Sequence, residues 1–256
     1  MADTDALPVA GVPARLEPEA TPPVAPGEMS LVDHLVELRN RLIKVVIAIA
    51  VCSVVGFYFG DEIVRLLKAP IPGDRPLFFT GLGDAFVIKL KIAIVVGIII
   101  SMPVLLFQIW RFVSPGLTSA ERRVVAPWLP LAFVFFAIGT VIAYVILPFA
   151  AGFLVGFSTD DLQPLITAGE YFSFVTTMFL AFGLIMEFPI LLFGLSRVGI
   201  VTSQRLTAAR RPAILGIAIF ATAITPGGDL VSPFVLGLTM YLLFEGTIFF
   251  IRRSGK

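Results

Sequence analysis

The chain has 256 residues, of which 57% are hydrophobic and only 14% are charged, with a formal net charge of +1. A soluble domain carries about 25% charged residues, so this composition excludes an ordinary soluble protein and indicates an all-α membrane protein with several spans. The chain has one cysteine, Cys52, and one histidine, His34, which excludes an intramolecular disulfide and predicts neither a metal site nor another cofactor.

Residues 1–28 differ from the rest of the chain by their many alanines and prolines. They have neither a basic start nor a continuous apolar core, so they do not fit a secretory signal peptide. Dense proline with low hydrophobicity is typical of disorder, and we predict a disordered cytoplasmic tail over 1–28. A transmembrane domain is expected over 29–253, followed by a short cytoplasmic end over 254–256.

An amphipathic segment, SLVDHLVELRNRL, begins at Ser30. Its leucines follow one another at spacings that place them on one face of a helix, namely Leu31, Leu35, Leu38 and Leu42. Glu37 and Arg41 are expected to pair across one helical turn, with a stabilisation of roughly a few tenths of a kcal/mol. We expect this helix to lie at the interface and then to turn into the membrane.

Six apolar segments are predicted to span the membrane, at about 42–60, 85–109, 127–147, 172–195, 212–224 and 230–251. A short interfacial helix is expected near 63–67, and Pro148 is expected to end the third span. Segment 212–224 offers about 13 residues, or roughly 20 Å of helix, whereas a full span needs about 20 residues. We therefore predict that the fifth and sixth helices are short and thin the membrane locally.

Lys and Arg residues are distributed unequally between the two sides of this arrangement. The side of the chain ends holds thirteen of them, Arg39, Arg41, Lys44, Arg111, Arg122, Arg123, Arg197, Arg205, Arg210, Arg211, Arg252, Arg253 and Lys256. The other side holds five, Arg65, Lys68, Arg75, Lys89 and Lys91, with Arg15 of the tail left out. Because loops rich in Lys and Arg stay in the cytoplasm, both termini are predicted to be cytoplasmic.

The polar stretch 112–123, FVSPGLTSAERR, is predicted to be a cytoplasmic loop between the second and third spans. Glu121 is followed by two arginines, and Glu37 also has two arginines close by. Two interpretations stay open: solvated salt bridges worth under about 1 kcal/mol, or carboxylates that accept guanidinium groups in bidentate geometry. Phe112 and Pro115 taken alone fit an interfacial aromatic residue and a turn.

Glu187 lies within the fourth apolar segment and is followed by Pro189. An intramembrane carboxylate costs about 2.5–3.5 kcal/mol on insertion scales and usually faces protein or water. Glu187 is either a structural hydrogen-bonding group between helices, or a polar contact for a partner helix or a proton-linked site. Asp229, which ends the tight turn TPGGD, is a candidate N-cap of the last helix.

Motifs of common enzyme classes are absent from the sequence. No G-x-x-x-x-G-K-[ST], G-x-S-x-G or H-E-x-x-H motif occurs, so we expect that the protein is not an enzyme. The arginines are spread over membrane-proximal loops as topology signals, which excludes a nucleic-acid patch. A proton-coupled secondary transporter that uses Glu187 stays an alternative, although the six segments show no internal repeat.

Eight stretches occur in one order along the chain. They are HLVELRNRL (34–42), AP (69–70), MPVLLFQIWRFVSPGL (102–117), ERRVVAP (121–127), FGLIMEFPI (182–190), RRP (210–212), TPGGDLVSP (225–233) and MYLLFE (240–245). Together they resemble the TatC family, the polytopic component of the twin-arginine protein translocase. Each stretch alone is weak evidence, but so many in one order are specific.

The resemblance implies a cup-shaped receptor of six helices, in which Glu37 and Glu121 bind the twin-arginine motif of signal peptides. It places Phe112 in the same cytoplasmic site, where we also expect Arg39 and Pro115.

Further residues match other parts of the family pattern. Glu187 is implied to face the concave side and to contact TatA-type single-span subunits. Pro70 and Asp229 match a proline of the first outer loop and an aspartate of the outer turn. Pro233 departs from the glutamine that bacterial relatives often carry after this turn, which puts a polar partner contact there in doubt.

The implied function is that of a translocase core subunit in the cytoplasmic membrane, with several copies in one complex. Together with TatA- and TatB-type single-span partners, it would move folded proteins across the bilayer by the proton-motive force. No nucleic-acid partner is expected.

Overall fold

The computed structural model describes residues 31–71, 75–159, 161, 163, 165–197, 199–225 and 229–253. The predicted tail over 1–28 and the predicted end over 254–256 lie outside these ranges. The helices are α1 (Leu31–Tyr58), α2 (Gly60–Lys68), α3 (Asp84–Val113), the 3-10 turn η1 (Ser114–Gly116), α4 (Ser119–Val125), α5 (Trp128–Val155), α6 (Ala168–Ile185), α7 (Phe188–Arg197), α8 (Ser203–Ala208), α9 (Arg210–Ile224) and α10 (Val231–Arg253).

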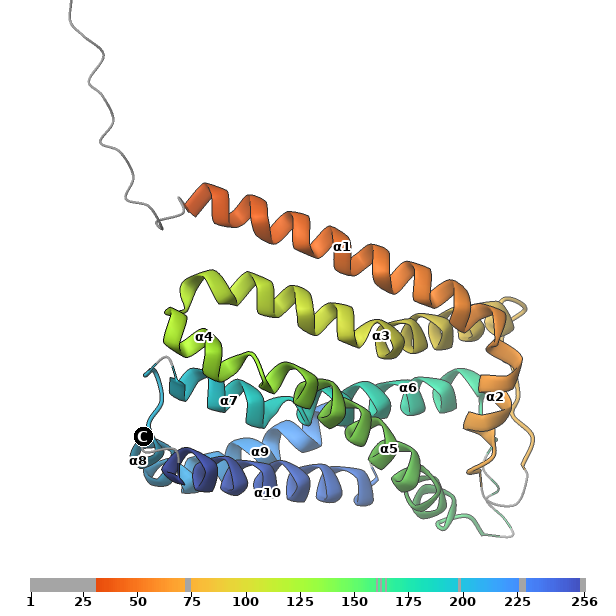
Figure 1. Ribbon diagram of the computed structural model, residues 1–256. Helices are drawn as coiled ribbons and strands as arrows, with labels where there is room; N and C mark the ends of the chain where they lie inside the picture. The colour runs from red at the N-terminus through yellow and green to blue at the C-terminus, as the bar shows by residue number, and fades with distance from the viewer. Residues whose placement is uncertain are drawn as a thin grey trace, which may run out of the picture.

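The long helices lie side by side and run between the two ends of one bundle (Figure 1). The end that holds η1, α4 and α8 is called the α4 end here, and the opposite end, which holds α2, the α2 end. The start of α1 and the end of α10 both lie at the α4 end, as an even number of spans predicts. The assignment of this end to the cytoplasm stays a prediction.

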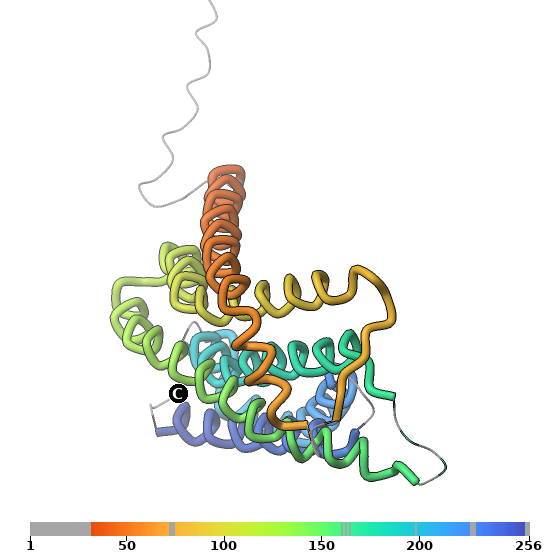
Figure 2. Tube along the Cα trace, turned by 90° about the vertical axis from the view of Figure 1, so that its right-hand side faces the viewer, coloured from red at the N-terminus to blue at the C-terminus, as the bar shows by residue number. Residues whose placement is uncertain are grey.

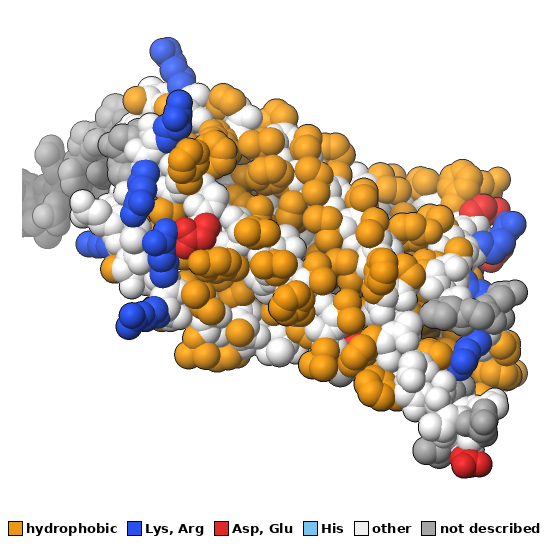
Figure 3. All heavy atoms as spheres, turned by 90° about the horizontal axis from the view of Figure 1, so that it is seen from below, with side chains coloured by type: hydrophobic (Ala, Val, Ile, Leu, Met, Phe, Trp, Pro, Cys, Tyr) orange, Lys and Arg blue, Asp and Glu red, His pale blue; other side chains and the backbone are white. Residues whose placement is uncertain are grey.

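The surface of the bundle is that of a protein surrounded by lipid. Hydrophobic side chains cover most of the middle of the molecule, and Lys and Arg side chains lie at its two ends (Figure 3). Five stretches of the described chain are long and apolar enough to cross a membrane, at Val32–Tyr58, Asp84–Gly116, Ser119–Val155, Ala168–Arg197 and Val231–Arg253.

The fifth predicted span is α9, which has 15 residues, or about 22 Å of helix. It is absent from the five candidate spans of the described residues, which confirms a short fifth helix and leaves the count of six spans a prediction. The sixth helix, α10, has 23 residues and is not short, which corrects the prediction. Its backbone stays helical through Glu245 to Arg253, because glutamate and arginine both have high helix propensity.

Helix α1 lies at the edge of the bundle, with α3 between it and the other helices (Figure 2). Most of its apolar side chains are exposed, as expected for a helix that faces lipid. Its contact with α3 is close because Gly97 has no side chain: a Cβ atom there would overlap Ser53 Oγ and the Ile49 carbonyl oxygen. Backbones that approach so closely are typical of helix pairs in membranes.

The third span does not end at Pro148, as predicted, but continues to Val155 within α5. Proline removes one backbone donor and disturbs the preceding turn. Inside a membrane, water offers no alternative partner to the neighbouring backbone groups, so the helix continues beyond the proline.

The fourth span is not one helix over 172–195, as predicted, but two helices, α6 and α7, interrupted at Met186 and Glu187. Pro189 explains the position of the break. It has no N–H to donate to the carbonyl of Ile185, and its ring clashes with that carbonyl. Glu187 therefore lies at a helix break and not in the middle of a helix.

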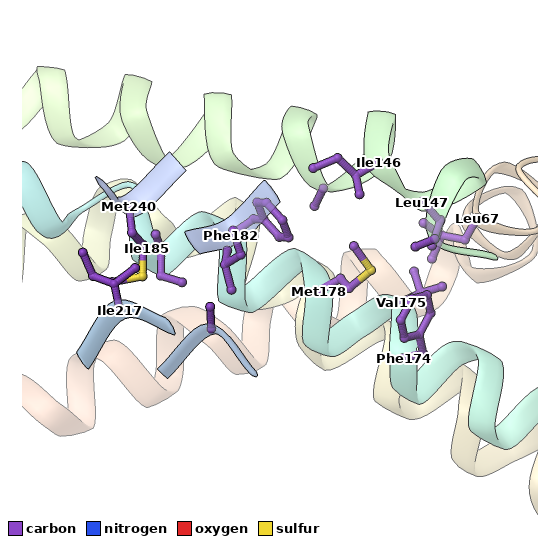
Figure 4. Packing of buried hydrophobic residues seen from close by; sticks show 14 of the residues in the cluster. Leu67, Ile146, Leu147, Phe174, Val175, Met178, Phe182, Ile185, Ile217 and Met240 are labelled. Atoms are coloured by element: carbon purple, nitrogen blue, oxygen red, sulfur yellow. The ribbon is translucent and has the colours of Figure 1, made fainter. Parts of the chain in front are cut away.

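The buried core surrounds α6, whose side chains meet α5, α9 and α10 (Figure 4). Val175, Met178 and Phe182 of α6 are each at most 1% exposed. A second cluster of buried residues, Met102, Leu106, Ala132 and Phe136, joins α3 to α5. Helix α6 is therefore the best covered element of the bundle, in contrast to α1.

The loops of the α2 end are tied together by backbone hydrogen bonds. Phe78 N–H donates to the Ile166 carbonyl at 3.1 Å, and Ala168 N–H donates to the Phe78 carbonyl at 2.8 Å. Tyr171 Oη donates to the Leu67 carbonyl at 2.6 Å, which fixes the end of α2 on α6. Pro70 follows Ala69, the C-cap residue of α2, and is half-buried.

Candidate functional site

The α1–α3 contact at the α4 end brings together five polar and aromatic side chains, which we call the rim site: His34, Glu37 and Arg41 of α1, and Gln108 and Phe112 of α3. Arg41 Nε donates to Glu37 Oε1 at 3.0 Å, and Arg41 Nη2 donates to the same oxygen. The predicted Glu37–Arg41 pair is thus confirmed. Arg41 Nη1 also donates to Gln108 Oε1 at 3.4 Å, which links the two helices.

The second oxygen of Glu37 is in a different situation. Oε2 is buried and makes no hydrogen bond to any described residue. His34 Nδ1 lies 3.9 Å from this oxygen. The imidazole ring of His34 stacks on Phe112, with 4.3 Å between the ring centroids. His34 therefore links Glu37 to Phe112.

A cavity of about 310 Å³ opens at this position. It is lined by acidic and basic side chains together with Val36 and Asn40, the charged ones being Asp33, Glu37, Arg41, Lys44 and Arg111. The Glu37 side chain is 21% exposed and that of Arg41 is 14% exposed, so both charges are sheltered from bulk water without being fully buried.

His34, Arg41 and Gln108 were not among the predicted binding residues. A signal for Arg41 was available, because its pairing with Glu37 follows from helical spacing. The sequence carries no comparable signal for the other two, since His34 meets Phe112, and Gln108 meets Arg41, only through the packing of α1 on α3.

Glu121 lies on α4, and its carboxylate closes a capping box. Its Oε2 accepts from the Thr118 N–H at 2.9 Å and from Thr118 Oγ1 at 2.8 Å, while Glu121 N–H donates to Thr118 Oγ1 at 3.3 Å. The stretch predicted as a loop is thus the end of α3, the turn η1 and the capped helix α4. The spacing of Thr118 and Glu121 in the sequence is typical of such a cap and predicts the start of a helix here.

The other predicted residues of this face are less closely connected. Pro115 lies in η1 and is exposed. Arg39 is exposed on α1 and makes no hydrogen bond or ion pair with any residue that the structure describes. It is two residues from Glu37, and side chains at that spacing do not face each other on a helix. No hydrogen bond or ion pair joins Glu37 to Glu121 within the described chain.

Glu187 is 8% exposed, at the break between α6 and α7. Its backbone is satisfied, because its N–H donates to the Leu184 carbonyl at 3.1 Å and its carbonyl accepts from Ile190 N–H at 3.1 Å. Its side-chain Oε1 is buried and has no hydrogen-bond partner among the described residues. A buried polar atom without a partner is unusual and needs a physical explanation.

Asp229 is 3% exposed, and its Oδ1 accepts from Ser232 N–H at 2.6 Å at the start of α10. The predicted N-cap is thus confirmed. Pro233 lies one residue further, in the first turn of α10, where a missing N–H costs little.

Comparisons with known proteins give one consistent result. Residues 33–238 match the family model "Sec-independent protein translocase protein (TatC)". The chain is 36% identical to the protein of that name from Carboxydothermus hydrogenoformans over 223 residues, which are 86% of this chain and 92% of the relative. It is 35% identical to the one from Escherichia coli K12 over 227 residues, 87% of this chain and 88% of the relative.

A solved structure agrees with these relatives. The crystal structure described as "Twin Arginine Translocase Receptor- TatC in DDM" superposes with a TM-score of 0.75 at 34% sequence identity. The match covers 85% of this chain and 99% of the other chain. Each of these relatives is named as a protein translocase component or receptor, and none is named as a solute transporter or an enzyme.

Proposed function

Since this chain belongs to the TatC family and is a multi-pass membrane subunit of the twin-arginine translocase, we propose that its rim site binds the twin-arginine signal peptides of folded cargo. The observation that carries the proposal is the state of Glu37. One carboxylate oxygen is held by Arg41 while the other, buried in the site, has no hydrogen-bond partner in the described chain.

A guanidinium group fits this environment better than other cations do. It is planar, weakly hydrated and able to donate two parallel hydrogen bonds to a carboxylate. Phe112, which His34 links to Glu37, adds an aromatic ring of the kind on which guanidinium groups stack. The sheltered carboxylate and the aromatic ring together favour arginine over lysine.

We assign the second arginine of the motif to Glu121, on the neighbouring helix α4. The capping box holds its carboxylate in one orientation, which lowers the entropy cost of binding. In this proposal the exposed Pro115 and Arg39 border the path of the peptide and do not hold the arginine pair.

At the break between α6 and α7, we assign Glu187 to contacts with single-span TatA- and TatB-type subunits. A buried carboxylate oxygen without a partner supports this role, because a polar group of a second helix would satisfy it. Pro70 and Asp229 are assigned structural roles in the loops of the α2 end and at the start of α10.

The proposed membrane arrangement has six spans, α9 being the short one, with both termini in the cytoplasm of a bacterial cell. The excess of Lys and Arg at the α4 end supports it. Several copies of the chain would assemble with the single-span partners and use the proton-motive force to move folded cargo.

The direct test is binding of a signal peptide to the full-length protein in detergent, followed by fluorescence anisotropy. We expect Glu37→Gln to weaken binding of the arginine-pair peptide by about 10- to 100-fold, because a charge-assisted hydrogen bond contributes about 1.5–3 kcal/mol. Glu62→Gln is the matched control, since Glu62 is an exposed carboxylate on α2 at the opposite end. Equal affinity of the Glu37→Gln variant and the unchanged protein would disprove the proposed site.

A further inference from the structure

Arg41 is bound to the Glu37 carboxylate, which in the proposed function binds an arginine of the signal peptide. Its Nε and Nη2 both donate to Glu37 Oε1, and its Nη1 reaches Gln108 Oε1 at 3.4 Å. A guanidinium group is thus already bound at Glu37 in the protein by itself. An incoming cation therefore meets a carboxylate of which one oxygen already accepts hydrogen bonds from Arg41.

The geometry points to Arg41 as a specificity-determining residue. The arginine of a signal peptide must either displace Arg41 from Glu37 or share the Glu37 carboxylate with it. This inference rests on the proposed function of the rim site. In this exchange, one guanidinium group replaces another, so the number of charges on Glu37 and the kind of hydrogen bond stay the same.

A lysine cannot make the same exchange. Its ammonium group is a compact, strongly hydrated charge without the planar fork of a guanidinium group. To replace Arg41, it would have to lose more hydration in a site where Glu37 is only 21% exposed, and it would make fewer aligned hydrogen bonds. The resident Arg41 therefore raises the barrier for lysine more than for arginine.

The free oxygen of Glu37 offers a first point of attachment. Oε2 has no hydrogen-bond partner among the described residues, and His34 Nδ1 lies 3.9 Å from it. The cargo arginine can bind Oε2 before Arg41 leaves Oε1. Gln108 of α3 accepts a hydrogen bond from Arg41, so the strength of this bond determines how readily Arg41 leaves Glu37.

The experiment compares two signal peptides that differ only in an arginine pair or a lysine pair, bound to the full-length protein in detergent. The readout is the ratio of their two affinities. We expect Arg41→Gln to lower this ratio by about three- to tenfold, mainly because the lysine peptide binds more tightly to the vacated carboxylate. Arg123→Gln removes the same charge from the exposed face of α4 and should leave the ratio unchanged.

Gln108→Leu is the second variant, because it weakens the anchor of Arg41 and alters neither charge. We expect it to lower the ratio in the same direction and by less, and thermal unfolding identifies any variant that has lost its fold. An unchanged ratio in both variants, or a parallel loss of affinity for both peptides in Arg41→Gln, would overturn the inference and leave Arg41 as a residue that only positions Glu37. Failure of the proposed function itself would appear separately, as unchanged binding in Glu37→Gln.

Discussion

The rim site and the break between α6 and α7 each hold one glutamate, and the two carboxylates differ in their hydrogen-bond partners. The Glu37 side chain, at the edge of the bundle, is 21% exposed and has a guanidinium group on one oxygen. Glu187 is 8% exposed, and its Oε1 has no partner in the described chain. At the rim, a guanidinium group of the same subunit is bound to the carboxylate, whereas at the break the buried carboxylate oxygen has no hydrogen-bond partner among the described residues.

The packing around the two sites differs in the same sense. The rim site lies where α1 packs on α3, the helix that separates α1 from the rest of the bundle (Figure 2). Most other side chains of α1 are exposed. The break is preceded by the best covered part of α6, where Phe182 is 1% exposed. Changes near the break should therefore affect folding most, and changes at the rim should affect binding with little effect on folding.

The largest effect is expected from Gly139→Ala, on the side of α5 that faces the break. A Cβ atom there would overlap the Phe182 carbonyl oxygen and lie 2.7 Å from Met186 Cγ. Because the overlap is with backbone that cannot move away, we expect a loss of about 2–3 kcal/mol of folding stability. Thermal unfolding of the protein in detergent measures it.

Gly194→Ala in α7 is the matched control for this change. Nothing lies within 4 Å of a Cβ atom at that position, so alanine should be neutral or stabilise the helix. Equal unfolding temperatures for the two variants would mean that α5 and α6 are not as close at Gly139 as the structure shows.

An intermediate effect is expected from Glu187→Leu, which removes the unpartnered carboxylate from the break. The isolated protein should become more stable by about 1–3 kcal/mol, because a buried polar atom without a hydrogen bond is destabilising. Co-purification with TatA-type subunits should fall at the same time. A less stable Glu187→Leu protein would instead show that the Glu187 carboxylate has a partner within the subunit, as Glu37 has.

The smallest effect is expected at an ion pair that joins α9 to α10, in which Arg210 Nη2 lies 2.6 Å from Glu245 Oε2. These side chains are 42% and 28% exposed, against 14% and 21% for Arg41 and Glu37. A double-mutant cycle with Arg210→Gln and Glu245→Gln should give a coupling of under about 1 kcal/mol. The same cycle on Arg41 and Glu37 should give a larger coupling energy, because these side chains are less exposed. A smaller coupling energy for Arg41 and Glu37 than for Arg210 and Glu245 would contradict this role of burial.

Much of the architecture could be predicted because it depends on local chemistry. The apolar segments, the short fifth helix, the helix near 63–67 and the cap at Asp229 follow from the hydropathy and spacing of neighbouring residues. The Glu37–Arg41 pair follows from helical geometry alone. Membership of the TatC family follows from the order of the motifs.

Three local predictions were wrong where proline or polarity was given the wrong weight. Pro148 was expected to end a helix and lies inside α5, whereas Pro189 was not expected to interrupt one and marks the break at Glu187. The stretch around Thr118 and Glu121 is predicted as a loop from its polarity, although it contains the signal of a capped helix. At Thr118 and Glu121 the side-chain capping box decides the outcome, whereas Pro148 and Pro189, both inside apolar segments, disturb the helix to different extents.

The sequence by itself determined the class of protein, the membrane segments and the residues that carry charge into or near the bilayer, because these depend on composition and on contacts within one helical turn. Only the tertiary structure decided that His34 stacks on Phe112, that Gln108 holds Arg41 and that Glu187 Oε1 lacks a partner in the described chain. These facts depend on how α1 packs on α3 and α5 on α6. Helix packing joins residues far apart in the chain, and no local pattern specifies which of them meet.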